Sequence, residues 1–352
     1  MKKRFDNPFV TTGYAGPEYF CDRQKETEDL IRLLRNGNNI ALISPRRYGK
    51  TDLLRHCFAQ DAISDNYYTF ITDIYSTKSV AEMVGKLGST ILEALKPKGT
   101  PSWSMSVGDI DSPKATLDEI FLYLRQAEKP CLIAIDEFQQ ISKYADSAIE
   151  AELRTHIQYC PNARFVFSGS RQHLMGQMFT SPARPFYQSV TLYTLNVLPQ
   201  EKYAEFCSSH FQKKGKHLDE RVVPALYGRF EGITYYIQRV MNELFSMTAQ
   251  GETCQLEDLD RAIQQIVRTS APIYEDLFYQ LPEKQSLVMR ALGKAGKVEN
   301  ITSSKFIKTY GLVSANSVKS AIPALVEKGL VTSERGEYQV YDKFFQIWME
   351  TV

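Results

Sequence analysis

The eight residues from Ser44 to Thr51, Ser-Pro-Arg-Arg-Tyr-Gly-Lys-Thr, constrain the fold of this chain more than any other segment. They follow a short apolar run, 39–44, and precede a segment with helical periodicity, 52–60. A strand, a glycine-containing turn and a helix in this order form a P-loop, which surrounds a phosphate with backbone N–H groups and the positive end of a helix dipole. The pattern therefore predicts an α/β fold built around a phosphate-binding turn.

Each residue of this turn is a candidate nucleotide ligand. Gly49 allows close backbone approach, Lys50 would place its ammonium against the β- and γ-phosphates, and Thr51 offers a hydroxyl to Mg²⁺. Ser44 stands at the first position, where the motif usually has glycine, and its small size favours an intact turn. The alternative is a chance Gly-Lys-Thr at a helix start. The candidate cofactor-binding residues of this segment are Ser44, Pro45, Arg46, Arg47, Tyr48, Gly49, Lys50, Thr51 and Asp52.

A second apolar strand ends in two carboxylates, in Leu132-Ile-Ala-Ile-Asp136-Glu137. Asp136 is a candidate Mg²⁺ ligand together with Thr51, and Glu137 is a candidate general base for the attacking water. The alternative is that the two acids only mark the end of a strand. That explanation is common for one carboxylate, but it accounts poorly for an Asp-Glu pair downstream of a P-loop.

Two further segments carry weaker candidates. Ser168 and Ser170 lie at the end of the strand 164–169, where a polar side chain would lie beside the γ-phosphate. The alternative is that they only begin the turn with Gly169. Arg184 lies in a proline-rich loop and is a candidate arginine finger, acting within the chain or on a neighbouring subunit. The alternative for Arg184 is a solvated loop residue.

The order of elements predicts three domains. Strands alternate with helices up to residue 198, which is typical of a three-layer α/β fold with a parallel sheet. Only helices are expected in 199–280, and 281–352 reads as three helices and a hairpin, the order of a winged helix. The expected boundaries are 1–198 for the nucleotide core, 199–280 for a helical lid and 281–352 for the winged helix. Within the core, we expect Asp22 to cap the first helix and residues 96–113 to form a surface loop.

Composition excludes several classes of protein. The 42 basic and 41 acidic residues leave a net charge of +1, so any nucleic-acid binding must come from a local patch. No apolar run approaches the roughly 18 residues that span a bilayer, so we expect no membrane partner. The N-terminus lacks the apolar region of a signal peptide. The six cysteines are scattered and the five histidines show no zinc-site spacing, which predicts reduced thiols and a cytoplasmic location.

The chain resembles the archaeal-type ATPase family of STAND-class P-loop proteins, which are relatives of AAA+ proteins and origin-recognition initiators. The P-loop with its Arg-Arg pair and the Asp136-Glu137 segment carry the resemblance. Three other segments contribute: Phe20-Cys-Asp-Arg23-Gln-Lys-Glu26, Phe230-Glu-Gly-Ile-Thr-Tyr-Tyr-Ile-Gln238, and Tyr338-Gln-Val-Tyr-Asp-Lys-Phe-Phe-Gln-Ile-Trp348. The resemblance implies that the segment of Arg23 packs near adenine. Thr234 stands where the family usually has proline.

The resemblance implies ATP and Mg²⁺ as cofactors and slow ATP hydrolysis in the absence of a partner. It also implies a switch in which the nucleotide state changes the arrangement of lid and winged helix. One alternative is a DNA-binding regulator that uses ATP as a structural ligand. Another is an interaction scaffold without hydrolysis, against which the intact Lys50, Asp136 and Glu137 argue. The winged helix is a candidate for DNA binding, for protein docking or for self-association. Between Asn300 and Val326 its charged residues are Lys305, Lys308 and Lys319, with no acidic residue.

Overall fold

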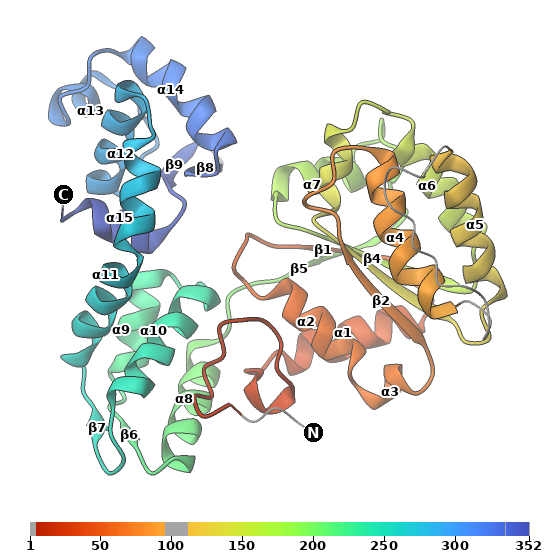
Figure 1. Cartoon of the computed structure of the whole chain (residues 1–352), viewed down its shortest axis with the longest axis horizontal. Coiled ribbons are helices and arrows are strands. Elements are labelled where there is room, and N and C mark those ends of the chain that lie inside the picture. The colour runs from red at the N-terminus through yellow and green to blue at the C-terminus, as the bar shows by residue number, and fades with distance from the viewer. Residues whose placement is uncertain (1–4, 96–111, 335, 352) are drawn as a thin grey trace. The chain divides into compact units, whose positions relative to one another are not determined.

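The computed structural model describes residues 5–95, 112–334 and 336–351, which form two compact units (Figure 1). The first unit comprises residues 1–206 and 232–235, and the second comprises 207–231 and 236–352. The chain thus leaves the first unit, returns to it for four residues and leaves it again. The domain boundaries expected at residues 198 and 280 stay predictions, and the two units are described separately below.

The first unit is built on a parallel sheet of five strands. The strands are β1 (Ile40–Ile43), β2 (Tyr68–Asp73), β3 (Cys131–Asp136), β4 (Ala163–Gly169) and β5 (Thr191–Thr194). Their order in the sheet is β2-β3-β4-β1-β5, and every neighbouring pair is parallel. The predicted α/β class with a parallel sheet is confirmed. Because β4 lies between β1 and β3, its carboxyl end lies between the P-loop and the acidic pair.

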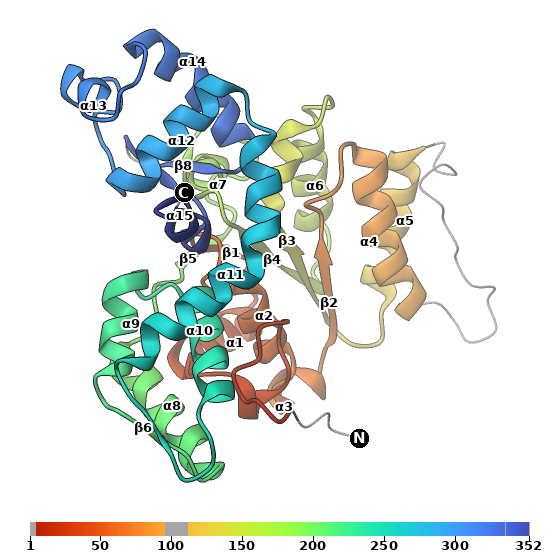
Figure 2. The ribbon, with the colours of Figure 1, turned by 60° about the vertical axis from the view of Figure 1, so that its left-hand side comes forward.

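Both faces of this sheet are covered by helices (Figure 2). The helices on one face are α1 (Gln24–Arg35), α2 (Lys50–Phe58) and α3 (Asp61–Ser64). Those on the other face are α4 (Val80–Leu95), α5 (Pro113–Gln126), α6 (Ile149–Gln158) and α7 (Gln172–Thr180). Within β3, Leu132 and Ala134 join the first core, whereas Ile133 and Ile135 join the second. Burial on both faces explains why β3 reads as a continuous apolar run.

Three local expectations have different outcomes. Asp22 does not cap α1, because Asp22 and Arg23 have φ of 50° and 68° and Arg23 occupies the cap position without a side-chain cap. Helix α7 was not expected, and Gly176 near its middle weakens the helical signal of that segment. The loop expected over 96–113 lies outside the described residues up to 111, and α5 begins at Pro113 after the capping Ser112.

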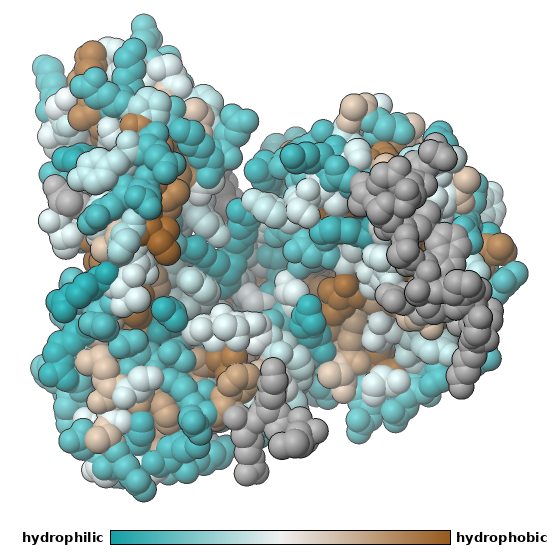
Figure 3. All heavy atoms as spheres, in the orientation of Figure 1, coloured by the Kyte–Doolittle hydropathy of each residue, from teal (hydrophilic) through white to brown (hydrophobic). Residues whose placement is uncertain are grey.

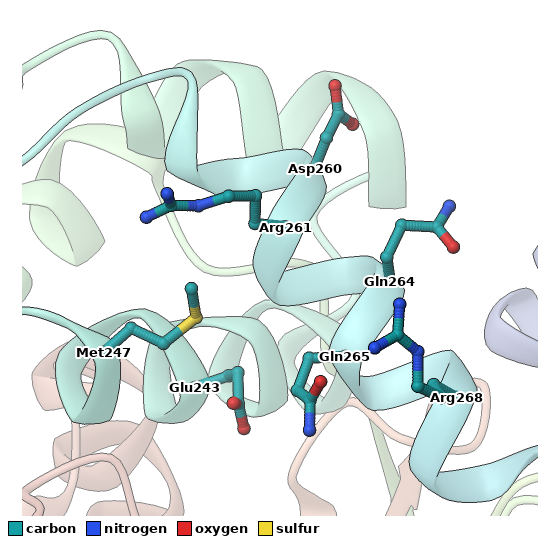
Figure 4. Close-up of a pocket in the computed structure, with 7 residues that line it drawn as sticks. All are labelled: Glu243, Met247, Asp260, Arg261, Gln264, Gln265 and Arg268. Carbon is teal, nitrogen blue, oxygen red and sulfur yellow. The ribbon is translucent and has the colours of Figure 1, made fainter.

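The second unit contains most of the predicted helical region. Its helices are the end of α8 (Gln200–Lys213), α9 (Val222–Phe230), most of α10 (Thr234–Met247) and α11 (Asp258–Tyr279). Two short strands that the sequence did not suggest, β6 (His217–Leu218) and β7 (Thr253–Cys254), pair in parallel. A groove of about 550 Å³ runs between α10 and α11 and is lined by polar side chains and Met247 (Figure 4).

The winged-helix elements follow in the predicted order. They are α12 (Glu283–Ala295), α13 (Ser304–Thr309), α14 (Ala315–Glu327), β8 (Val331–Glu334), β9 (Glu337–Val340) and α15 (Lys343–Met349). Strands β8 and β9 form an antiparallel hairpin. The Phe345 ring lies 5.2 Å from Tyr274 of α11, and Trp348 lies 5.9 Å from Phe278 of the same helix. The C-terminal aromatic residues Phe345 and Trp348 are therefore core residues.

The cysteines are buried, and the surface seen in Figure 3 is mostly polar. Hydrophilic residues cover most of the face of each unit seen in Figure 3. Within the described ranges, no helix combines the length and apolarity that a membrane span requires. All six cysteines are free and buried, and burial raises the pKa of Cys21 and Cys131 to about 12, so these thiols stay protonated.

Candidate nucleotide site

The predicted P-loop lies between β1 and α2 in the first unit. Gly49 has φ 84° and precedes the first residue of α2, and this left-handed conformation is the reason why glycine is needed there. Ser44 is fully buried, and its N–H lies 3.4 Å from the carbonyl oxygen of Gly169 at the end of β4. The turn therefore forms with serine at its first position, in agreement with the expectation.

The Lys50 ammonium is buried within the turn itself. It donates to the carbonyl oxygens of Ser44 at 3.0 Å and Pro45 at 3.1 Å. Burial lowers the pKa of Lys50, while the charges of Asp136 and Glu137 raise it. Both carboxylates therefore act electrostatically on this lysine, although they come from a different strand. A phosphate would offer the ammonium stronger, charged acceptors than these carbonyl oxygens.

Thr51 and Asp136 meet although 85 residues separate them in the chain. The Thr51 hydroxyl donates to Oδ2 of Asp136 at 2.5 Å, and Asp136 is 5% exposed. A hydroxyl oxygen and a carboxylate oxygen are hard donors of the kind that Mg²⁺ prefers. The two side chains predicted as metal ligands are thus side by side, and their chemistry fits this ion.

Glu137 directly follows Asp136 and is held by two neighbouring side chains. Its backbone is left-handed, with φ 55°, and its N–H donates to Oδ1 of Asp136 at 3.0 Å. Ser170 Oγ donates to Oε2 of Glu137 at 2.9 Å, and Gln139 Nε2 donates to the same oxygen at 2.5 Å. The predicted base is therefore oriented by groups from the end of β4 and from the turn after β3.

The structure distinguishes the two serines at the end of β4. Ser170 contacts Glu137 and accepts a hydrogen bond from Arg46 Nε at 3.3 Å, which connects the P-loop to the predicted base. Ser168 is fully buried, and its Oγ has no hydrogen-bond partner among the described residues. Of the two, Ser170 is thus the one that joins the predicted catalytic group, and Ser168 as a nucleotide ligand stays a prediction.

The remaining P-loop arginine points to a different neighbour. Arg47 has φ 72°, its guanidinium carbon lies 4.8 Å from the centre of the Tyr235 ring, and its carbonyl oxygen accepts from Tyr235 N–H at 3.2 Å. Tyr235 belongs to the four-residue return of the chain to the first unit. This contact attaches the first turn of α10 to the P-loop, and nothing in the sequence pattern alone indicated it.

Arg23 is a buried residue that hydrogen-bonds to the backbone of the P-loop. It is 3% exposed, pairs with Glu26 at 2.6 Å, and donates to the carbonyl oxygens of Asn196 at 2.7 Å and Tyr48 at 3.5 Å. These partners belong to α1, the P-loop and the segment after β5. The structure thus places Arg23 where it positions backbone around the turn.

Asp52, in the first turn of α2, faces the segment that precedes α1. Burial raises the pKa of Asp52, and a hydrogen bond from the Tyr14 backbone N–H lowers it. Its carboxylate thus connects the segment before α1 to the helix that follows the P-loop. As with Arg23, its role as a cofactor-binding residue stays a prediction.

Arg184, the predicted arginine finger, forms an ion pair with Glu150 of α6. Glu150 is buried, and Arg184 is 36% exposed at its side chain. Burial raises the pKa of Glu150, and the charge of Arg184 lowers it. This pair anchors the loop after α7 to α6, and a role for Arg184 on a neighbouring subunit stays a prediction.

Two family models match this chain. A family model described as an ATPase domain predominantly from Archaea matches residues 20–240. The chain belongs to this ATPase family. A second model, described as "Probable winged helix domain", matches residues 272–351 of the ATPase. Among curated proteins there is no match.

Several solved structures share the fold of this ATPase. A Walker-type ATPase of Pyrococcus abyssi is 16% identical with a TM-score of 0.69, and the match covers 97% of this chain and 99% of that one. The ORC1 protein of Aeropyrum pernix, solved in complex with DNA, is 14% identical with a TM-score of 0.60 over 98% and 96% of the two chains. The ORC2 protein of the same organism, solved as ADPNP-ADP complexes, is 14% identical with a TM-score of 0.61 over 98% of each chain.

Proposed function

We propose that this ATPase is a Mg²⁺-dependent nucleotide switch that hydrolyses ATP and couples its nucleotide state to the arrangement of its lid and winged helix. The observation that carries the proposal is the hydrogen bond between Thr51 and Asp136, with Glu137 directly after it. It brings the two candidate metal ligands together from α2 and β3, next to the candidate base. Phosphoryl transfer to water requires groups of this kind: a hydroxyl and a carboxylate that can hold Mg²⁺, and a second carboxylate that can act as the base.

In the proposed reaction the chain's own groups bind, orient and move a proton. Backbone N–H groups of the P-loop and the Lys50 ammonium would hold the phosphates, and Lys50 would exchange its carbonyl contacts for them. Mg²⁺, when held by Thr51 and Asp136, would neutralise charge on the β- and γ-phosphate oxygens. Glu137 would accept a proton from the water that adds to the γ-phosphorus as the bond to the leaving ADP breaks.

Two consecutive tyrosines support the coupling part of the proposal. Tyr235 packs against Arg47 of the P-loop within the first unit. Tyr236, the next residue, lies in the second unit, where its hydroxyl donates to the Tyr341 carbonyl oxygen at 3.0 Å and accepts from Lys343 N–H at 3.1 Å. A displacement of the P-loop would thus act on a residue whose neighbour is bonded to the winged helix.

The experiment that tests hydrolysis is phosphate release by the purified protein with ATP and Mg²⁺, compared with Glu137→Gln. We expect a loss of at least about 100-fold in the variant, the lower end of what a general base contributes. Equal turnover of the two proteins would refute the catalytic assignment. Small-angle scattering with ADP and with a non-hydrolysable ATP analogue tests the switch, and identical curves would refute it.

A second candidate function is duplex DNA binding by the winged helix. Its support is the stretch from Asn300 to Val326, which carries three lysines and no acidic residue, together with the fold shared with an ORC1 protein solved on DNA. Helix α14 begins with a capping box of Ser314 and Ser317, which defines its N-terminus. Affinity that falls by decades between low and moderate salt would support this function.

A further inference from the structure

Gln139 is a buried polar residue beside the predicted base. It lies in the 3-10 turn Phe138–Lys143 that follows β3, and it is 3% exposed. Its amide nitrogen donates to Oε2 of Glu137 at 2.5 Å. Its Oε1 atom has no hydrogen-bond partner among the described residues, so this contact with a carboxylate is the one that satisfies the buried amide.

The packing around Gln139 fixes its amide group in place. A Cβ atom added to Gly169 would lie 2.4 Å from Gln139 Oε1 and 2.5 Å from Met175 Sδ. Only a residue without a side chain leaves room at this point, because either contact is far below van der Waals distance. The end of β4 therefore accommodates the Gln139 amide on one side and supplies the Ser170 hydroxyl on the other.

The two donors leave one carboxylate oxygen available. Within the described part of the chain, Gln139 and Ser170 are the side chains that hydrogen-bond the Glu137 carboxylate, and both use Oε2. Each carboxylate oxygen has about two lone-pair sites, so these donors fill Oε2. Oε1 then stays available as the acceptor for a water proton.

We propose that Gln139 is a positioning residue for ATP hydrolysis, which together with Ser170 holds the Glu137 carboxylate with Oε1 directed to the attacking water. The inference rests on the proposed function, in which Glu137 is the base. The left-handed backbone of Glu137, at φ 55°, costs energy and is retained where surrounding contacts determine it. The bonds to Gln139 and Ser170 are contacts of this kind.

The test compares two glutamines of the same turn. Gln139→Met removes the donor at nearly constant side-chain length. Gln140→Met is the matched control, because the Gln140 amide donates to the Thr77 carbonyl oxygen at 2.8 Å and not to Glu137. We expect kcat to fall about 10–100-fold in Gln139→Met, with ADP affinity within about twofold of wild type, because misplacement of a catalytic group by about 1 Å has an effect of this size. Gln140→Met should retain the wild-type kcat.

A double-mutant cycle separates positioning from general damage. In a Glu137→Gln background, Gln139→Met should lower the residual rate no further, because the group that it positions is already lost. Equal kcat for Gln139→Met and Gln140→Met, a higher kcat in Gln139→Met, or a full additional loss in the Glu137→Gln background would each overturn the inference. Wild-type turnover of Glu137→Gln alone would instead refute the proposed base.

An isosteric variant keeps the test valid if Gln139→Met does not fold. In Gln139→Glu the new carboxyl can donate to Glu137 only when it is protonated. The kcat of this variant, relative to wild type, should therefore rise as the pH is lowered. A pH-independent ratio would contradict the requirement for a donor at this position.

Discussion

Gly169→Ala is the substitution whose effect follows most directly from the geometry of the site. The added Cβ would lie 2.4 Å from Gln139 Oε1, 2.5 Å from Met175 Sδ and 2.6 Å from Met175 Cγ. All three contacts are shorter than Cβ atoms show in folded proteins, so Gln139 or Met175 must move. Overpacking of a buried site costs about 1–3 kcal/mol, and we expect the free energy of unfolding of the first unit to fall by this amount.

The same displacement should also affect hydrolysis. If the Gln139 amide moves away from Glu137, kcat should fall together with stability. Gly176→Ala in α7 is the matched control, because, apart from the chain neighbours and the backbone of α7 itself, no described atom lies within 4 Å of the added methyl group. Alanine is the better helix former, so Gly176→Ala should leave kcat unchanged and raise stability by up to about 1 kcal/mol.

The assay is urea denaturation followed by circular dichroism, with and without nucleotide. The transition that shifts to higher urea on addition of ADP reports the first unit, because a ligand of the native state stabilises the unit that binds it. If Gly169→Ala unfolded at the same urea concentration as Gly176→Ala and hydrolysed ATP at the wild-type rate, the packing reasoning at the end of β4 would be refuted.

Three other perturbations have defined outcomes. Tyr236→Phe removes two hydrogen bonds and should lower the unfolding free energy of the second unit by about 1–3 kcal/mol in the same urea assay. Arg184→Met should destabilise the first unit by about 2–3 kcal/mol at neutral pH, less than for a fully buried pair, since Arg184 is 36% exposed. Burial raises the pKa of Glu150, so this carboxyl group binds a proton at a higher pH in the native state than in the unfolded state. The loss of stability in Arg184→Met should therefore become smaller as the pH falls, which thermal melts at several pH values would show. If the winged helix binds duplex DNA, replacing Lys305, Lys308 and Lys319 together by alanine should make the negative slope of log affinity against log salt less steep by about 2–3. A fluorescence titration at several salt concentrations measures this slope.

Sequence reasoning located the elements that carry strong local patterns. The strand before Ser44 and the strand that ends at Asp136 are both apolar runs followed by chemically distinctive residues, and both lie where they were expected. The winged-helix order was also visible, because α12, α14 and the β8–β9 hairpin each have clear periodicity or a turn. These features depend on neighbours in the chain, and one sequence contains that information.

Contacts between distant segments were not visible in the same way. Ser170 and Gln139 meet at Glu137 only because β4 lies next to β3, and strand order is a property of the folded sheet. Asp22 illustrates a local failure: aspartate favours the cap position, but the left-handed turn is held by the Arg23 side chain, which bonds to Asn196 far along the chain. In both cases tertiary hydrogen bonds determine the outcome.

The tyrosine pair in α10 shows how one helix turn can join a contact in the first unit to a contact in the second. Tyr235 and Tyr236 are adjacent in the first turns of one helix, whose backbone hydrogen bonds resist independent movement of neighbouring residues. The Tyr235 backbone N–H depends on the Arg47 carbonyl, which lies inside the P-loop, and the Tyr236 hydroxyl depends on the backbone at Tyr341 and Lys343. If nucleotide binding reorients the Arg47 carbonyl, the helix start must either lose this hydrogen bond or move with it. Movement would carry Tyr236 and its winged-helix partners. Tyr235→Pro removes the backbone N–H that donates to Arg47, so it should reduce the scattering difference between nucleotide states while leaving Lys50, Thr51 and Asp136 in place.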